Sequence, residues 1–444
     1  MSRRRNRNKR LPPETAQTNI ESLAHDGRGV AHLEDRAVFI SGALPGEEVV
    51  FEYTKKKKDI AEGRVTEVLS ASPDRVEPGC QHYAICGGCS FQHLAPEKQI
   101  IAKQSILIDQ FKSIGKLKDI ELWPALTGPF WGYRRRARLG VKDVIKKNRV
   151  LVGFREKASP FLADIESCEV LHSDVGKRLL DLSGLIEGLS IKNKIPQIEV
   201  SVGDHRTALV FRILAELTTE DKEKLAAFEA SADMDVYLQP KGPDTITALT
   251  VEKPPLSYLL PNDVTLYFGP SDFVQVNLDI NRDMINRAIQ TLDLNENDQV
   301  LDLFCGLGNF TLPMARVAGH VTGVEGSDEL IQRAKINAEM NKLDNTTFYA
   351  ANLMENIDAE PWVKKTYNKV LIDPPRLGAK EILHWLPKWK AEQVLYISCN
   401  PSTLARDAGI LVNELGYTLK KAGVMDMFPH TSHVESIALF EKTN

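Results

Sequence analysis

The chain has 444 residues, of which 43% are hydrophobic and 26% charged, and its formal net charge is −4 at pH 7. This length allows about two to four domains, and the composition is that of a globular protein rather than a disordered or fibrous one. Its apolar runs fall short of the roughly 18 residues that a membrane helix needs. No apolar segment follows the basic start to make a secretory signal. We therefore expect a cytoplasmic protein with no membrane association.

Basic residues gather in three segments although the chain is acidic overall. Six of the first ten residues are Arg or Lys, residues 55–58 are all lysine, and residues 131–158 hold ten Lys or Arg against two acids. A single charge run is often only a solvated surface. Three of them on a net acidic chain favour a polyanion, most simply a nucleic acid, as partner. We interpret residues 1–14 as a basic tail.

Residues 15–74 alternate short β-like runs with turns and show no helical pattern. Short strands at close spacing predict a small five-stranded barrel of the OB type. Its length and position are similar to those of the TRAM domain of RNA-modifying enzymes.

Three of the six cysteines lie close together, at Cys80, Cys86 and Cys89, with two glycines in the short gap. A metal or cluster site needs a fourth thiolate, and Cys168 is the one cysteine left outside the expected α/β domain. Four thiolates suit either a [4Fe–4S] cluster or a structural zinc ion. Because zinc sites usually pair two C-x2-C motifs and this chain has one, the spacing favours iron–sulfur. In a reducing cytosol such cysteines bind metal more often than they form disulfides.

The remainder of the chain divides into a helix, a mainly β region and an alternating region. Residues 96–115 have apolar residues at helical spacing, and residues 127–268 read mainly as strands with a few helices. From residue 277 strands alternate with helices, which predicts a doubly wound α/β sheet. The expected strands are 299–304, 320–325, 347–351, 369–372, 393–398 and 434–440.

The segment "QVLDLFCGLGNFTLPMA", residues 299–315, reads as a strand, a glycine turn and the start of a helix. A dinucleotide fingerprint needs a third glycine where this chain has Thr311. Glu325 ends the next strand, where an acid can bind both hydroxyls of a ribose. Asn352 follows the third strand, where an adenine edge would lie. Asp373 follows the fourth strand in "IDPPR", and the two prolines make a stiff loop that aims its carboxylate at the crevice. These features fit S-adenosylmethionine better than NAD.

Together these motifs resemble the RNA uracil-C5 methyltransferase family. The resemblance covers residues 15–441 and rests on the four cysteines, "FVQVN" (273–277), "LDLFCGLGNF", "VEGS", "IDPPR", "YISCNP" and "HVESIALF". The most similar branch carries a TRAM domain and an iron–sulfur cluster and methylates a uridine of 23S ribosomal RNA, which implies uracil 1939 as target. The tRNA branch lacks the small barrel and the cysteine cluster.

The resemblance implies the fold, the site and the partner. The fold is an α/β Rossmann-like class I SAM-dependent methyltransferase domain (96–126 and 269–444), a TRAM-like OB barrel (15–74) and a mainly β central domain with an iron–sulfur cluster (75–95 and 127–268). The cofactor contacts would be Gln275, Phe304, Asn309, Glu325, Asn352 and Asp373, and the nucleophile Cys399. The partner would be a single-stranded or loop region of 23S ribosomal RNA with a flipped uridine, bound by a monomer.

The chemistry of the reaction also points to Cys399, and it adds a second residue at a strand end. Carbon 5 of uracil is a poor nucleophile until a thiolate adds at C6, and a base must then remove the C5 proton. Cys399 leaves a strand just before Pro401 opens a helix, whose N-terminal amides supply a positive field that should favour the thiolate. Glu435, at the start of the last strand, is the best candidate base. Cys305 is expected only to pack.

Several alternatives remain open at this point. The target could be another 23S site, two sites, or tRNA. A cytosine-C5 methyltransferase is disfavoured because that family typically places a second catalytic cysteine on the Asp-Pro-Pro loop, and "DPPRLG" has none. A nicotinamide oxidoreductase is disfavoured by Thr311. A non-enzymatic RNA-binding factor would not need Cys399, Asp373 and Glu435 together.

Overall fold

The computed structural model describes residues 14–443 in two compact units. Unit 1 comprises the chain up to Gln81 with Cys89–Ile106 and His430–Ser432, and unit 2 comprises His82–Gly88, Leu107–Pro429 and the chain from His433 on. The expected basic tail, residues 1–14, lies outside the described residues except for its last one. Among the described residues, no helix combines the length and apolar character needed to cross a membrane.

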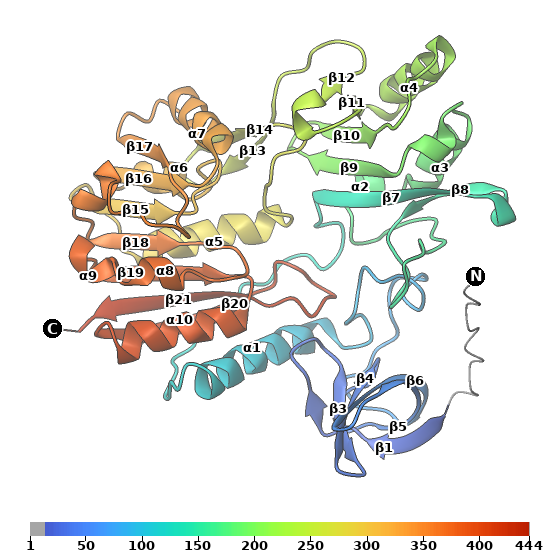
Figure 1. Ribbon diagram of the computed structural model, residues 1–444, viewed down its shortest axis with the longest axis horizontal. Helices are drawn as coiled ribbons and strands as arrows, with labels where there is room; N and C mark the ends of the chain where they lie inside the picture. Colours follow the sequence, from blue (N-terminus) through green and yellow to red (C-terminus); the bar gives the residue numbers. More distant parts are fainter. Residues whose placement is uncertain (1–13, 444) are drawn as a thin grey trace, which may run out of the picture. The chain divides into compact units, whose positions relative to one another are not determined.

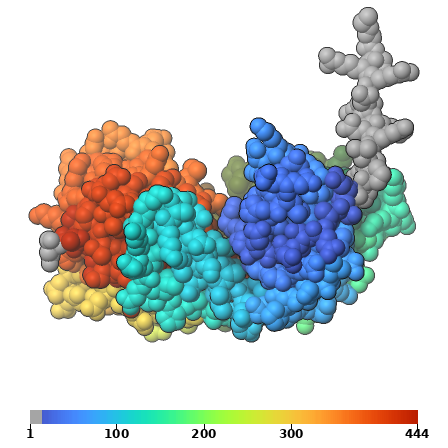
Figure 2. All heavy atoms as spheres, turned by 90° about the horizontal axis from the view of Figure 1, so that it is seen from below, coloured from blue at the N-terminus to red at the C-terminus, as the bar shows by residue number. Residues whose placement is uncertain are grey.

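Unit 1 is built on one six-stranded sheet, which forms a rounded body coloured dark blue in Figure 2. Its order is β1-β5-β6-β4-β3-β2, and β4 and β6 are its one parallel pair of neighbours. The strands are β1 (Thr15–Asn19), β2 (Ser22–Leu23), β3 (Gly29–Leu33), β4 (Arg36–Ser41), β5 (Glu48–Lys56) and β6 (Ile60–Ser70). The expected count of five strands is wrong by one, since β2 has only two residues and too little pattern to be recognised. A barrel of the OB type stays a prediction.

The core of this sheet is small and apolar, with alternate residues of each strand pointing inward. Its buried members include Ile20, Val38, Ile40, Val49 and Phe51. Gly63 of β6 is needed here, because a Cβ at this position would lie 2.4 Å from the ring of Phe51. Close approach of backbone to an aromatic ring therefore explains the glycine inside a strand.

A polar side chain organises the remainder of unit 1. Helix α1 (Pro96–Ser113) agrees with the helix expected at 96–115. Its fully buried Gln99 donates from Nε2 to the carbonyls of Phe91 and Leu94, at 3.1 and 2.9 Å. The Gln99 Oε1 accepts from the His430 amide at 2.8 Å. One amide side chain thus hydrogen-bonds three backbone groups; of these, the Phe91 carbonyl also accepts from the Leu94 amide at 2.9 Å.

The central part of unit 2 is a second six-stranded sheet, in the order β12-β11-β10-β9-β7-β8. The strands are β7 (Arg136–Val144), β8 (Arg149–Gly153), β9 (Gln197–Val202), β10 (Thr207–Arg212), β11 (Asp235–Gln239) and β12 (Thr247–Ala248). The helices are η1 (Ile145–Lys147), α2 (Ser173–Gly176), α3 (Leu179–Glu187), η2 (Lys192–Lys194), α4 (Thr219–Ala232) and η3 (Pro243–Thr245). This confirms a mainly β region with a few helices.

The C-terminal part of unit 2 is a seven-stranded sheet in the order β17-β16-β15-β18-β19-β21-β20, and Figure 1 shows the strands side by side in this order. They are β15 (Gln299–Leu303), β16 (His320–Glu325), β17 (Thr346–Ala350), β18 (Lys369–Ile372), β19 (Gln393–Ser398), β20 (Tyr417–Met425) and β21 (Glu435–Lys442). The five strands from β15 to β19 are parallel, and β21 is antiparallel to β19 and β20. The expected doubly wound sheet is confirmed.

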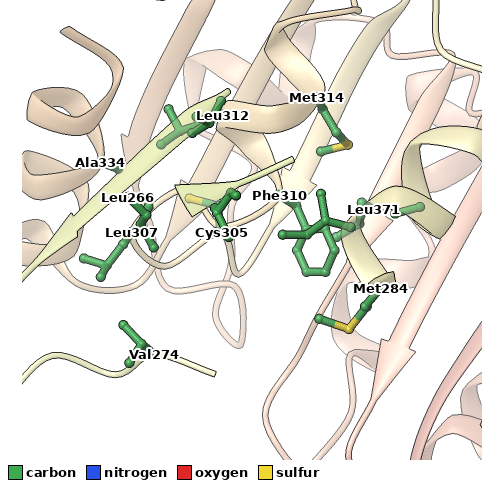
Figure 3. Close-up of a cluster of buried hydrophobic side chains, with 14 of the residues drawn as sticks. Leu266, Val274, Met284, Cys305, Leu307, Phe310, Leu312, Met314, Ala334 and Leu371 are labelled. Carbon is green, nitrogen blue, oxygen red and sulfur yellow. The ribbon is translucent and has the colours of Figure 1, made fainter. Parts of the chain in front are cut away.

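Helices and a hairpin cover this sheet. They are a hairpin of β13 (Leu256–Leu260) and β14 (Val264–Phe268), the helices α5 (Leu278–Thr291), α6 (Thr311–Ala315), α7 (Asp328–Met340), α8 (Lys380–Leu383), α9 (Leu386–Trp389) and α10 (Pro401–Asn413), and η4 (Pro361–Lys364). Figure 3 shows part of the core, in which Leu266 of the hairpin and Met284 of α5 lie in one cluster with Cys305 and Leu307. The loop after β15 is therefore part of the core, which gives it a fixed shape.

Candidate functional site

The loops that follow β15, β16, β17, β18 and β19 leave the same edge of the sheet, because these strands are parallel and adjacent. The antiparallel β21 begins at that edge. Seven of the eight residues expected to bind cofactor or act in catalysis stand there, namely Phe304, Asn309, Glu325, Asn352, Asp373, Cys399 and Glu435. The eighth, Gln275, lies in the segment just before α5. The strand order therefore gathers at one edge residues that the sequence spreads over more than a hundred positions.

The loop after β15 has an unusual backbone. Phe304, Gly306 and Gly308 have φ values of +65°, +54° and +92°, a region that side chains other than glycine rarely adopt. The amides of Phe304 and Cys305 both donate to the Val324 carbonyl, at 2.9 and 3.1 Å, which holds the turn. A Cβ at Gly306 would meet no atom within 4 Å, so the space beside the loop is open. Backbone can approach a ligand closely here.

Glu325 lies directly beside this loop. Its carboxylate accepts from the Gly306 amide at 3.2 Å and from the Gly326 amide at 2.8 Å. Two backbone donors fix its orientation and leave further lone pairs available. A held carboxylate at the end of the second strand is the arrangement that can accept from both hydroxyls of a ribose.

The two asparagines are engaged with neighbouring groups. Asn309 and the fully buried Asn281 of α5 exchange two hydrogen bonds, at 2.8 and 2.9 Å, which tie the β15 loop to α5. The exposed Asn352 donates to Glu355 at 2.7 Å and accepts from the Met354 amide at 3.1 Å. Both side chains are therefore oriented before any ligand is bound. Asn281 was not foreseen, because nothing in the sequence pairs it with Asn309.

Asp302, inside β15, is a second residue that sequence reasoning missed. It is fully buried, one oxygen accepts from Thr311 Oγ1 at 2.5 Å, and the other has no hydrogen-bond partner among the described residues. Burial raises the pKa of Asp302 to about 7; the Thr311 bond opposes this rise, and the carboxylates of Asp373 and Glu325 add to it. An acid within the apolar run "VLDLF" was the available signal.

Asp373 is the first residue after β18. Its amide donates to the Leu303 carbonyl at 3.3 Å, which continues the pairing of β18 with β15. Burial raises the pKa of the Asp373 carboxyl to about 7. A nearby positive charge would strongly favour the ionised form of Asp373, because it would offset the cost of burying the carboxylate.

Cys399 and Glu435 stand opposite each other at this edge. The antiparallel register of β19 and β21 ends at the pair Ser398↔Ser436, so the next residue on each side is Cys399 and Glu435. Opposite residues of an antiparallel pair have their side chains on the same face of the sheet. The register therefore brings the expected nucleophile and the expected base together.

The pKa of the Cys399 thiol is raised to about 11, first by burial and then by the carboxylates of Glu435 and Asp373, while the Arg376 guanidinium lowers it. The expectation that the start of α10 would favour the thiolate is therefore wrong for the protein alone. The N-cap of α10 is occupied by its own residue, since the Asn400 side chain accepts from the Ser402 amide at 3.1 Å. Burial and the two carboxylates raise the pKa of Cys399 by more than Arg376 and the backbone hydrogen bond at Cys399 lower it.

Some of the arginines of the basic segment 131–158 form hydrogen bonds and ion pairs within the fold. Arg134 Nε donates to the Arg136 carbonyl at 3.0 Å, and Arg135 Nη1 donates to the Gly203 carbonyl at 2.7 Å. Arg136 forms a half-buried ion pair with Glu199 at 2.8 Å. The guanidinium groups of Arg135 and Arg136 thus connect the start of β7 to β9 and to the residue that follows it. The exposed basic residues of the segment are spread along it: Arg138 and Lys142 lie on β7, Lys146 and Lys147 at the turn between β7 and β8, and Arg155 and Lys157 after β8.

The cysteines expected to bind a cluster are divided between the units. Cys80 and Cys89 belong to unit 1, and Cys86 and Cys168 to unit 2, where both pack against the central core. All four are half-buried and form no disulfide. The Gly88 amide lies 3.4 Å from Cys86 Sγ, as a donor to sulfur. Within residues 14–443 the structure brings no three His, Cys, Asp or Glu side chains together as a metal site.

Comparison with known proteins identifies the family and the fold. A family model described as tRNA (Uracil-5-)-methyltransferase matches residues 260–443, and the TRAM domain model matches residues 14–66. The crystal structure of the Pyrococcus abyssi tRNA (uracil-54, C5)-methyltransferase with S-adenosyl-L-homocysteine has a TM-score of 0.73 and 24% identity, and covers 96% of this chain and 100% of that one. This likeness establishes the methyltransferase fold.

Two curated relatives extend over the whole chain. The 23S rRNA (uracil(1939)-C(5))-methyltransferase RlmD of Methylococcus capsulatus is 54% identical over 440 residues, 99% of each protein. The protein of the same name from Alkalilimnicola ehrlichii is 51% identical and covers 100% of this chain and 99% of its own length. With the TRAM domain at its start and the methyltransferase sheet at its end, the chain belongs to the family of 23S rRNA (uracil-C5)-methyltransferases.

Proposed function

We propose that this protein transfers a methyl group from S-adenosyl-L-methionine to C5 of uracil 1939 in 23S ribosomal RNA and so forms 5-methyluridine. The observation that carries the proposal is the register of β19 and β21, whose last pair, Ser398 and Ser436, leaves Cys399 and Glu435 as the next residues at the edge where Glu325 and Asp373 also lie. A nucleophile, a base and two ligand-binding acids at one edge are what this reaction needs. Full-length relatives at 54% and 51% identity, named for that reaction, support the choice of substrate.

The cofactor would lie along the loops after β15, β16 and β17. Glu325, already oriented by two amides, would accept from the ribose hydroxyls, and Asn352 would face the adenine. Phe304 and Asn309 would line the open space beside Gly306. Gln275 and Asp373 would face the methionine end, where the carboxylate of Asp373 lies near a positive sulfonium.

Cys399 would begin the reaction by adding its thiolate to C6 of the uracil ring, so that the C5=C6 electron pair moves towards the O4 carbonyl as an enolate. Carbon 5 then attacks the methyl carbon, and the carbon–sulfur bond of the cofactor breaks to leave S-adenosylhomocysteine. Glu435 takes the proton from C5, the electrons restore the C5=C6 double bond, and the Cys399 thiolate leaves. Each covalent bond made in the first step is broken in the last.

The high pKa of the Cys399 thiol would restrict its reaction to protein that has bound the cofactor. With a pKa of about 11, only about one thiol in ten thousand is ionised at pH 7. A cofactor sulfonium would offset the carboxylate charge of Asp373 and so lower the pKa of Cys399. The thiolate would then form mainly when cofactor is present, and an unloaded site would react poorly with other electrophiles.

The partner would be a single-stranded or loop segment of the RNA. A stacked base cannot reach the sheet edge, so the target uridine would be flipped out into the site. The exposed lysines and arginines of residues 131–158 and of the TRAM domain would contact phosphates. We propose a monomer that acts in the cytoplasm, where ribosomal RNA is found, with the domains at 15–74, at 75–95 with 127–268, and at 96–126 with 269–444.

We further propose that Cys80, Cys86, Cys89 and Cys168 hold a [4Fe–4S] cluster. Four unbridged, half-buried thiols form a suitable donor set, and the Gly88 amide beside Cys86 Sγ is a hydrogen bond of the kind that stabilises cluster sulfur. The cluster would have a structural or RNA-positioning part, because methyl transfer moves no net electrons. Zinc on the same thiols is the alternative.

The proposal is tested by mapping methylated uridines. Ribosomal RNA from cells that lack the protein should carry unmodified uracil 1939, and purified protein with S-adenosylmethionine should restore 5-methyluridine at that position. Methylation of a different 23S site, of two sites, or of tRNA would keep the reaction and change the target. No methyl transfer to any RNA would overturn the proposal and favour a binding role.

A further inference from the structure

A buried carboxylate connects three elements behind the nucleophile. Asp407, on α10, is fully buried. Its Oδ2 accepts from the hydroxyl of the buried Tyr396 on β19 at 2.6 Å and from the Ala379 amide at 2.8 Å. Its Oδ1 accepts from Arg406 Nε at 2.7 Å. Such a carboxylate is costly to bury unless its lone pairs are satisfied, and here each oxygen has a donor.

These contacts fix the loop that follows Asp373. Arg406 Nη2 donates to the Leu377 carbonyl at 2.9 Å. The Arg376 carbonyl accepts from Asn400 Nδ2 at 3.0 Å and from Thr403 Oγ1 at 3.3 Å. Together with the Ala379 bond, three of the four loop residues from 376 to 379 are hydrogen-bonded to α10 or its N-cap.

The fourth residue of the loop, Gly378, is required by the same contacts. Its φ is +79°, and a Cβ there would lie 2.5 Å from Arg406 Nη2 and 2.6 Å from Asp407 Oδ2. A side chain would therefore displace the ion pair between Arg406 and Asp407. At Gly378 the loop and α10 therefore lie too close together to admit a side chain.

The loop is important because it carries a charged group, Arg376, that acts on Cys399. The charged groups that act on the Cys399 thiol are Glu435 on β21, Asp373 just before this loop, and Arg376 on the loop itself. Asp373 is held separately, by its amide bond to Leu303 at 3.3 Å and by the prolines that follow. Arg376 is exposed, and among the described residues its backbone is hydrogen-bonded to Asn400, the neighbour of Cys399, and to Thr403 rather than to the sheet, so the place of its backbone depends on α10 and its N-cap.

We propose that Asp407 is a positioning residue which, with Tyr396 and Arg406, fixes the loop Arg376–Ala379 against α10 and so keeps the Arg376 guanidinium close to Cys399. This inference rests on the proposed function only in giving Cys399 its role as nucleophile. As a consequence, the positive charge of Arg376 partly offsets the two carboxylates that raise the pKa of the thiol. Arg376 opposes the two carboxylates only while the loop is fixed.

The test is the pH dependence of Cys399 alkylation by iodoacetamide, followed on the peptide that contains Cys399 by mass spectrometry. Asp407→Asn retains one acceptor oxygen but presents an amide to Arg406, and should release the Leu377 contact. We expect Cys399 to be alkylated at least about threefold more slowly at pH 8, an upward pKa shift of about half a unit or more. Arg406→Gln should give the same shift, and Tyr396→Phe a smaller one.

Asp221→Asn is the matched control, because Asp221 is also buried and hydrogen-bonded but lies at the start of α4 in the central part. It should lower the melting temperature and leave the alkylation profile of Cys399 unchanged. If Asp407→Asn does not fold, Arg406→Gln and Tyr396→Phe still test the inference. Variants that lose stability but alkylate with the wild-type profile would overturn the inference. Since alkylation needs neither RNA nor cofactor, a wild-type protein that fails to methylate would refute the proposed function alone.

Discussion

Cys399 follows Ser398 and Glu435 precedes Ser436, the last pair between β19 and β21, so the antiparallel register sets the two residues opposite each other. The two residues are 36 positions apart in the sequence. A chain reversal through α10 and β20 brings them together. Because β21 is antiparallel to the five parallel strands, its first residue lies at the edge where those strands end. The one antiparallel strand thus places the proposed base beside the proposed nucleophile, at the edge where the parallel strands end.

Replacing Glu435 should separate proton removal from the earlier steps. Glu435→Gln keeps the shape of the side chain but cannot take the C5 proton, so a methylated RNA adduct on Cys399 should accumulate. Turnover should fall about 10²–10⁴-fold, the usual contribution of a general base. Denaturing gels with methyl-labelled cofactor measure the adduct directly. Glu441→Gln, on the same strand, is the control and should behave as wild type. Turnover of Glu435→Gln at the wild-type rate would assign the base to another group.

The raised pKa of Cys399, about 11, predicts a steep pH dependence of its reactivity. Since the thiolate is the reactive form, alkylation of Cys399 in the free protein should rise about tenfold per pH unit between pH 7 and 10. S-adenosylmethionine should increase the rate at pH 8, because its sulfonium offsets the Asp373 carboxylate. S-adenosylhomocysteine, which fills the same space without the charge, is the control. Equal effects of the two ligands would show that charge is not the cause.

Asp302 predicts how stability depends on pH. Its pKa is raised from 3.8 to about 7, so between these values the folded protein holds a proton that the unfolded chain has lost. Stability should therefore fall as pH rises through this window, and Asp302→Asn should remove this contribution. The free energy of unfolding of the variant relative to wild type should rise by about 2–4 kcal/mol from pH 4 to 7. Urea unfolding at several pH values measures it.

The control for this experiment has a pKa shift of the opposite sign. Burial acts to raise the pKa of Asp221, but hydrogen bonds from Ser190 and Thr218 outweigh it and lower the value to about 2. Asp221→Asn should therefore destabilise by a nearly constant amount between pH 4 and 7. If the difference in unfolding free energy between Asp302→Asn and wild type stays constant from pH 4 to 7, the burial argument is contradicted.

The proposed cluster predicts a metal content. Protein purified without oxygen should be brown and contain iron and sulfide near four per chain, as one [4Fe–4S] cluster requires. Replacing Cys86 or Cys168 with alanine should remove most of the iron. Cys305→Ala, which changes a buried cysteine of the methyltransferase core, should leave the iron unchanged. Colourless, active protein with stoichiometric zinc would assign the thiols to zinc instead.

The sheet edge could be predicted from sequence because parallel strands end at one edge whatever the details of packing. Glu325, Asp373 and Cys399 each end or follow an apolar run, and that local pattern is sufficient. Strand β20, Tyr417–Met425, was missed because Lys420 and Lys421 interrupt its apolar pattern.

The partners of the site residues were not predictable in the same way. Asn281, Asp302 and Asp407 act through side chains on other elements, 28, 9 and 28 residues from Asn309, Thr311 and Ala379, respectively. No spacing rule connects such pairs. The sign of the Cys399 shift was also wrong, because the helix start is local whereas Glu435 and Asp373 come from distant strands.

The central claim is that Cys399 attacks C6 of the target uracil, and a fluorinated substrate tests it most directly. RNA that carries 5-fluorouridine at position 1939 has no C5 proton to lose, so wild-type protein with S-adenosylmethionine should form an adduct that survives denaturation. Mass spectrometry should place the RNA on Cys399. Cys399→Ala should form no adduct and lose activity by about 10³-fold or more, whereas Cys305→Ala should still be trapped. An adduct on another residue, or none with an active protein, would contradict the account.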